Sequence, residues 1–182
     1  MSDHYPLPET PAQENISFEL NGEAVTRSAS DAGTLLDILR ESGQITSVRP
    51  GCRVGRCGAC QVLLDGRAVP SCLVMAWQLP GHHVQTVEGL DKDSDFLAVR
   101  DALASESALQ CGYCTPGFAV SLVAGIRQRR QGSTVDLTEC VAGNLCRCTG
   151  YGGLRRAIDQ LSAPDCPDEA DGRSVSLSEN QR

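Results

Sequence analysis

Ten cysteines are the residues of this 182-residue chain that could carry chemistry, and eight of them fall into closely spaced groups. Thiolates bind iron or zinc, form disulfides, or act as nucleophiles. So many cysteines in a chain of this length are typical either of secreted disulfide scaffolds or of intracellular metal-binding proteins. The spacing within the groups therefore decides which chemistry the sequence predicts.

The first group lies in the stretch PGCRVGRCGAC and in a later PSC. Its spacing is Cys52-x4-Cys57-x2-Cys60, then eleven residues, then Cys72. This is the spacing of plant-type 2Fe-2S sites. Gly51, Gly55 and Gly58 alternate with these cysteines. We expect the glycines to take positive φ angles, so that the loop turns tightly and directs backbone N–H groups at the sulfurs.

The second group consists of two close pairs, Cys111-x2-Cys114 and, after 31 residues, Cys146-x-Cys148. Zinc sites usually space their cysteines by two to four residues, and a disulfide between residues as close as the second pair would be strained. Each pair precedes a predicted helix, whose N-terminal partial positive charge favours thiolates and an anionic cluster. Two irons can each take one close pair. The spacing therefore predicts a second 2Fe-2S cluster, held between helices.

The first half of the chain, which carries the first group, has β-strand patterns. Alternating apolar residues flank Asn21-Gly22 and Asp65-Gly66, two dipeptides that favour hairpin turns. Between the hairpins, Thr34 and Asp37 form a capping pair at the start of an amphipathic helix. HHVQTVEGL reads as a closing strand. We predict a small mixed sheet with one helix packed on it.

The second half is helical in pattern. Ser94 is expected to cap its first helix, and Thr115 to cap the second, with Pro116 at the first helical position. Four helices of roughly ten residues fit a small bundle. They are predicted within residues 94–107, 115–130, 134–144 and 149–163.

The chain is thus predicted to be α+β with two domains and two terminal segments. The four parts are a flexible arm (1–13), the β-rich domain (14–90), the helical domain (91–162) and a disordered acidic tail (163–182). Most of the net charge of −7 falls in the two terminal segments. No basic stripe with interleaved aromatics indicates nucleic-acid binding, and no apolar run is long enough for a membrane span. No export signal is visible, so we expect a cytoplasmic protein.

Together, PGCRVGRCGAC, QCGYCTPG and NLCRCTGYGG resemble the small iron–sulfur subunit of the molybdenum hydroxylases. That family includes xanthine dehydrogenase, aldehyde oxidoreductase and carbon monoxide dehydrogenase. The resemblance covers about residues 15–162 and all eight ligand positions. It implies a plant-type ferredoxin-like β-grasp domain followed by a four-helix bundle, each with one 2Fe-2S cluster.

The resemblance also implies partners. A large subunit would carry molybdopterin, in its cytosine dinucleotide form, and the acceptor would be an FAD subunit or another electron carrier. Gln110 matches the residue that approaches the pterin, and Cys148 matches the cluster ligand closest to it. Electrons would pass from molybdenum through the second cluster to the first and outward. The chain itself would hold no catalytic residue.

Other interpretations remain beside this one. The cysteines could stabilise a zinc-dependent interaction module, or the chain could be a free-standing two-cluster ferredoxin. Cys140 is expected to be a small buried residue and Cys166 incidental in the tail, while His82-His83 is expected in a solvent-facing turn. Arg127, Arg129 and Arg130 are more often a solvated helix end than a docking patch. The arginines at 147, 155 and 156 could raise the potential of the second cluster, contact the partner or have a plain surface role. Trp77 and Leu79 could belong to an interface or to the core.

Overall fold

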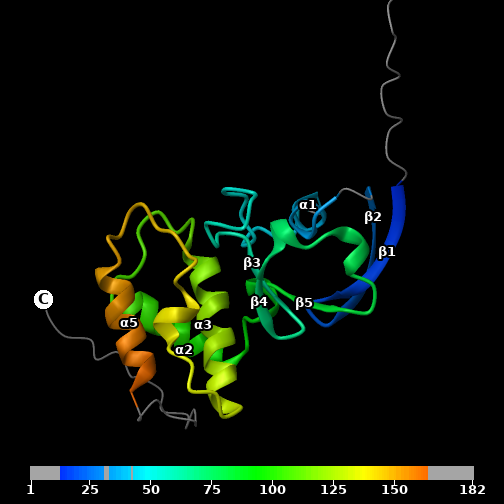
Figure 1. Cartoon of the computed structure of the whole chain (residues 1–182). Coiled ribbons are helices and arrows are strands. Elements are labelled where there is room, and N and C mark those ends of the chain that lie inside the picture. The colour runs from blue at the N-terminus through cyan, green and yellow to red at the C-terminus, as the bar shows by residue number, and fades with distance from the viewer. Residues whose placement is uncertain (1–12, 31–32, 42, 164–182) are drawn as a thin grey trace, which may run out of the picture.

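The computed structural model of the chain describes residues 13–30, 33–41 and 43–163 (Figure 1). The predicted arm at 1–13 and the predicted tail at 163–182 lie outside the described residues, except for the innermost residue of each. Cys166 lies outside them as well. Within the described residues no helix is long and apolar enough to cross a membrane.

Five strands form one mixed sheet in the first half of the chain, in the order β2-β1-β5-β3-β4. The strands are β1 (Gln13–Leu20), β2 (Glu23–Ser30), β3 (Gln61–Leu64), β4 (Arg67–Pro70) and β5 (His83–Gln85). The two predicted hairpins are β1–β2 and β3–β4, with positive φ angles at both residues of each turn. The last strand does not close an edge: β5 runs between the hairpins, parallel to β1 and antiparallel to β3.

One helix, α1 (Leu35–Glu41), packs on this sheet, and three short 3-10 helices follow the second hairpin. The hydroxyl of Thr34 donates to the Asp37 carboxylate at 2.6 Å, and the Asp37 N–H donates back to the hydroxyl at 3.3 Å, as the sequence predicted. The 3-10 helices are η1 (Ser71–Leu73), η2 (Ala76–Gln78) and η3 (Val87–Gly89). This half is therefore ferredoxin-like, with a mixed sheet and one covering helix.

The second half contains α2 (Ser94–Ser105), α3 (Thr115–Arg130), α4 (Leu137–Cys140) and α5 (Gly152–Ser162). Helix α3 is central, because its residues 117–125 are all buried among the other helices and the sheet. The predicted stripe on α5 is buried, as expected, at Leu154, Ala157, Ile158 and Leu161. Helix α4 is a single turn, shorter than the predicted ten residues, so three long helices and one short turn share this core.

Two predicted helix starts differ by one residue. Asp93 caps α2, accepting a hydrogen bond from the Phe96 N–H at 3.0 Å, and the predicted cap Ser94 is the first helical residue. Helix α3 begins at Thr115 and makes no side-chain cap hydrogen bond, and Pro116 is its second residue. Asp93 is the better cap because its carboxylate carries a charge that favours the helix N-terminus.

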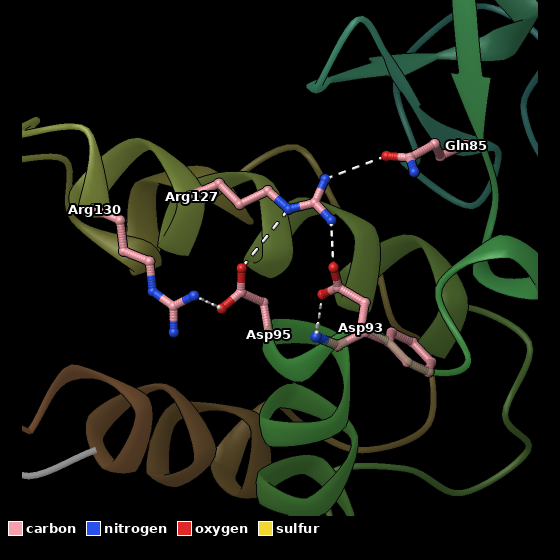
Figure 2. A network of polar contacts seen from close by, with 6 residues as sticks. Gln85, Asp93, Asp95, Arg127 and Arg130 are labelled. Atoms are coloured by element: carbon pink, nitrogen blue, oxygen red, sulfur yellow. Dashed lines mark hydrogen bonds and ion pairs between the residues drawn. The ribbon is translucent and has the colours of Figure 1, made fainter. Parts of the chain in front are cut away.

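An ionic network joins the two halves where α3 lies against the sheet (Figure 2). The guanidinium of Arg127 donates to the side-chain oxygen of Gln85 on β5 at 3.3 Å and to Asp93 at 2.7 Å. Its Nε lies 3.7 Å from the buried Asp95 carboxylate, which also pairs with Arg130 at 2.7 Å. One arginine of α3 thus ties the start of α2 to a strand of the sheet.

Candidate metal centres

Two hairpin strands and a loop bring the first four cysteines together. Cys52 and Cys57 lie in the loop between α1 and β3, and Cys60 directly precedes β3. Cys72 lies in η1, directly after β4, and the Ser71 N–H donates to the Cys60 carbonyl at 3.1 Å. Because β3 pairs with β4, the residues flanking the hairpin, Cys60 and Cys72, are neighbours.

Backbone N–H groups of this loop point at the sulfurs, as predicted. Those of Val54 and Arg56 lie 3.4 and 3.1 Å from the Cys52 sulfur. The Gly55 N–H lies 3.3 Å from the Cys72 sulfur. The hydrogen bond from Val54 is the main reason why the pKa of Cys52 falls to about 7, whereas burial raises the pKa of Cys72 to about 11. Such donors stabilise negative charge on sulfur and hence on a bound cluster.

The glycines of the first cysteine loop have two different structural roles. Gly55 and Gly58 take the expected positive φ angles, 73° and 68°. Gly51 does not, contrary to the prediction; a Cβ there would lie 2.6 Å from the Cys57 sulfur, so this glycine makes room for a thiol. Arg53, which the sequence did not single out, takes the third positive φ of the loop at 56°.

The second quartet comes from two loops of the helical half. Cys111 and Cys114 lie between α2 and α3, and Cys146 and Cys148 lie between α4 and α5. These loops and the first cysteine loop all reach the same end of the molecule, the upper end in Figure 1. All four residues line one cavity of about 210 Å³.

In this second site the close sulfur contacts join one cysteine of each motif. The sulfurs of Cys148 and Cys111 are 3.5 Å apart. Those of Cys114 and Cys146 also form a hydrogen bond. Burial, the larger effect, and this contact raise the pKa of Cys114 to about 12, although a backbone N–H at the start of α3 acts in the opposite direction and lowers it. Burial opposes ionisation of Cys146 too, but hydrogen bonds from Thr149 outweigh it and lower the pKa to about 7.

The donor set and its pairing fit a two-iron cluster at each site. In the first site the contacts are Cys52 with Cys57 and Cys60 with Cys72. A 2Fe-2S cluster takes two thiolates on each iron, whereas a tetrahedral zinc ion needs four ligands around one point. The sequence analysis expected each iron of the second cluster to take one close pair, whereas the close sulfur contacts in the structure run crosswise, joining Cys111 with Cys148 and Cys114 with Cys146.

Of the other residues that the sequence analysis singled out, Gln110 lies beside a quartet, and Cys140, His82 and His83 lie apart from both. Gln110 is exposed and directly precedes Cys111. Cys140 is half-buried against Gly125 of α3. His82 lies in the predicted turn, with its ring nitrogen 2.5 Å from the Asp65 carboxylate, whereas His83 is the first residue of β5 and its ring nitrogen lies 2.9 Å from the Glu19 carboxylate.

Two surface predictions resolve. Arg127 is not a solvated helix end, because its side chain is only 25% exposed and is held by the network of Figure 2. Leu79 is fully buried, whereas Trp77 is 64% exposed.

The sequence analysis did not predict the contacts between the two cysteine regions. The Arg49 guanidinium stacks 5.3 Å from the Tyr113 ring centroid and donates to the Gly112 carbonyl, while the Tyr113 hydroxyl donates to the Pro50 carbonyl at 2.6 Å. Asn144, two residues before Cys146, is buried. The only signal in the sequence for the Arg49–Tyr113 contact and for Asn144 was their position near a cysteine, because a buried polar side chain gives no periodic pattern.

Comparison with known proteins also indicates two 2Fe-2S binding regions, which together cover most of the chain. Residues 18–88 match the family described as 2Fe-2S iron-sulfur cluster binding domain, and residues 86–159 match the 2Fe-2S binding domain family. Among curated relatives, a probable xanthine dehydrogenase subunit from Bacillus subtilis is 43% identical over 149 residues, covering 82% of this chain and 86% of the relative. The nicotine 6-hydroxylase small subunit of Paenarthrobacter nicotinovorans is 40% identical, with 82% and 88% covered.

Solved structures agree. Quinoline 2-oxidoreductase from Pseudomonas putida 86 has a chain that is 36% identical, with a TM-score of 0.72 over 84% of this chain and 92% of that one. The aldehyde oxidoreductase from Desulfovibrio desulfuricans has a TM-score of 0.70 at 36% identity over 80% of this chain, but over only 16% of its own much longer one.

Proposed function

Because the chain belongs to the family of small iron–sulfur subunits of molybdenum hydroxylases, we propose that its two cysteine quartets hold two 2Fe-2S clusters that relay electrons from a molybdenum subunit to an acceptor. Within an oxidoreductase complex of this kind, the chain is a non-catalytic subunit. The observation that carries the proposal is the cavity lined by all four cysteines of the helical half.

The proposed ligands of the first cluster are Cys52, Cys57, Cys60 and Cys72. Those of the second are Cys111, Cys114, Cys146 and Cys148. Following the sulfur contacts, each iron of the second cluster would take one thiolate from the α2–α3 loop and one from the α4–α5 loop. When bound, each cluster accepts and releases one electron at a time. The chain's part is to supply thiolates and the N–H donors that stabilise negative charge on them.

Exposed apolar residues support two docking faces. Beside the second quartet, Tyr113 and Leu145 are exposed, and so are Cys148 and Gln110. We propose that this face meets the large subunit, with Gln110 and Cys148 toward its molybdopterin. In the half of the chain that carries the first quartet, Cys52 is exposed, and so are three apolar residues close in sequence to its cysteines, Val54, Leu73 and Trp77. We propose that this face meets the acceptor, an FAD subunit or another carrier.

The domain division belongs to the same proposal. One cluster lies in a ferredoxin-like domain of residues 14–90 and the other in a helical domain of residues 91–162. Helices α2 to α5 are the counterpart of the four-helix bundle that the family resemblance implies, with α4 reduced to one turn. A cytoplasmic location would suit free thiols that must load iron.

The test is purification of the assembled complex through an affinity tag on this chain, with co-purifying chains identified by mass and with metal and flavin analysis. We expect a larger chain that contains molybdenum, and iron that stays with this chain when the complex is dissociated. In the complex, Cys148→Ser should remove one of two electron paramagnetic resonance (EPR) signals. The matched control Cys140→Ser, a thiol outside both quartets, should keep both. Purification of this chain alone, without molybdenum, would contradict the proposal.

A further inference from the structure

The two cysteine regions are in direct contact through the backbone. The Leu145 N–H donates to the Cys57 carbonyl oxygen at 2.9 Å. Leu145 directly precedes Cys146, so a ligand of each quartet lies next to this hydrogen bond in the chain. Cys57 also lines the cavity that holds the second quartet. This hydrogen bond therefore connects a residue of the first quartet directly to the neighbour of a residue of the second.

The neighbouring residue Asn144 makes a second attachment at the same place. Its side chain is 4% exposed, and its Nδ2 donates to the Gly58 carbonyl at 3.3 Å. The hydroxyl of Ser121 on α3 donates to Asn144 Oδ1 at 3.1 Å, which fixes the amide so that its NH₂ group faces Gly58. Two successive carbonyls of the first loop, those of Cys57 and Gly58, thus accept from two successive residues of the second.

The backbones around this attachment are packed so closely that two positions have no room for a Cβ atom. A Cβ on Gly58 would lie 2.6 Å from Asn144 Nδ2, so only a glycine lets the loops approach. A Cβ on Gly117 of α3 would overlap the Gly58 carbonyl oxygen. The segment that carries Asn144 has no regular secondary structure after α4. Its position depends on these contacts and on the Asn144 N–H, which donates to the Val141 carbonyl.

We propose that Asn144 is a positioning residue that holds the Cys57 carbonyl on the Leu145 amide and so keeps the two cysteine quartets at a fixed separation for electron transfer. The inference rests on the proposed function, because it needs both clusters. A buried amide that loses its partner leaves buried polar groups unpaired, which opens the contact instead of merely weakening it. Arg49 and Tyr113 join the first loop to a different segment, the α2–α3 loop, and are more exposed than Asn144, so they do not replace it.

The test compares Asn144→Asp with Asn21→Asp in the full chain loaded with clusters. Asn144→Asp keeps the shape of the side chain but turns a carboxylate oxygen toward the Gly58 carbonyl, so the donor is lost and the two oxygens repel. Asn21 is a matched control, since its amide likewise bridges to Thr86 but lies in the β1–β2 turn, apart from both cysteine regions.

Three readouts separate positioning from a structural role. Iron content should stay at the wild-type level in both variants. Hydrogen exchange at the peptide containing Leu145 should become several-fold faster in Asn144→Asp alone. In the fully reduced chain, the EPR splitting caused by interaction of the two clusters should narrow or vanish in Asn144→Asp and persist in Asn21→Asp. Wild-type exchange and splitting in Asn144→Asp would overturn the inference.

A second variant decides the case in which Asn144→Asp loads less iron. Ser121→Ala removes only the hydroxyl that orients the Asn144 amide, and we expect full iron with faster Leu145 exchange and a reduced splitting. Unchanged exchange and splitting in Ser121→Ala would then overturn the inference. Failure of the proposed function looks different, because the wild-type chain would itself lack two interacting clusters.

Discussion

Replacing Arg127 by alanine should destabilise the junction between the two halves by about 2 kcal/mol. The change removes the donors to Gln85 and Asp93 and leaves the buried Asp95 with Arg130 (Figure 2). Breaking a fully buried pair costs about 3–5 kcal/mol. Since the Arg127 and Asp93 side chains are about a quarter exposed, solvent screens part of this, and about 2 kcal/mol remains. Arg127→Lys, which keeps the charge but loses the planar fork, should cost about half as much.

The assay is thermal unfolding of the cluster-loaded chain at a single scan rate, because loss of the clusters makes unfolding irreversible. For a chain of this size, about 2 kcal/mol would lower the midpoint of a reversible transition by roughly 4–8 °C, and at a fixed scan rate we expect a lowering of the same order. Arg155→Ala, at an exposed position on α5, controls for loss of a surface arginine. If Arg127→Ala unfolds at the same temperature as Arg155→Ala, the network contributes no net stability and the reasoning is wrong.

Three other substitutions test further contacts. Burial disfavours the charge of Glu88, but hydrogen bonds from Ser47 and Thr86 outweigh it and lower the pKa to about 2; this stability is complete above pH 4.5 and is lost as the pH falls toward 2. Because the side chain is partly exposed, Glu88→Gln should cost only about 1–2 kcal/mol at pH 7. Amide exchange at residues 46–47 should be faster in Glu88→Gln than in the wild-type chain, and this difference should shrink below pH 4.5. A difference between the two proteins that does not change with pH would contradict this. Gly117→Ala should lower the unfolding midpoint by the equivalent of about 1–3 kcal/mol because its Cβ meets Gly58, whereas Gly152→Ala, whose Cβ meets only the end of Arg156 at 3.9 Å, should not; equal midpoints would count against the close approach. Tyr113→Phe should cost about 1 kcal/mol and speed amide exchange at Arg49 and Gly51, which flank Pro50, because the hydrogen bond to the Pro50 carbonyl is lost; unchanged exchange would show that the hydroxyl does not hold the loop.

Local chemistry explains what could be predicted. The turns at Asn21-Gly22 and Asp65-Gly66 and the Thr34–Asp37 capping pair depend on neighbouring residues, and the structure has all of them. The cysteine spacing predicted both quartets for the same reason, because the closely spaced cysteines of each motif lie near one another in the sequence. The ferredoxin-like half and the helical character of the second half followed from these pieces and from the change of periodicity near residue 90.

The parts that could not be predicted depend on residues far apart in the chain. The insertion of β5 between the hairpins is a pairing of distant strands, which no local pattern encodes. The ion pairs of Arg127 needed the packing of α3 against the sheet, so a charged helix end looked solvated. The crosswise pairing of the second quartet likewise appears only once the α2–α3 and α4–α5 loops face each other.

The most direct test of the account is iron and acid-labile sulfide analysis of the chain purified without oxygen, combined with EPR of the reduced protein. Two clusters predict about four irons and about four sulfides per chain, with two distinguishable signals. A chain that binds zinc in place of iron, or that holds about two irons with a single signal after anaerobic purification, would contradict the assignment of the two quartets.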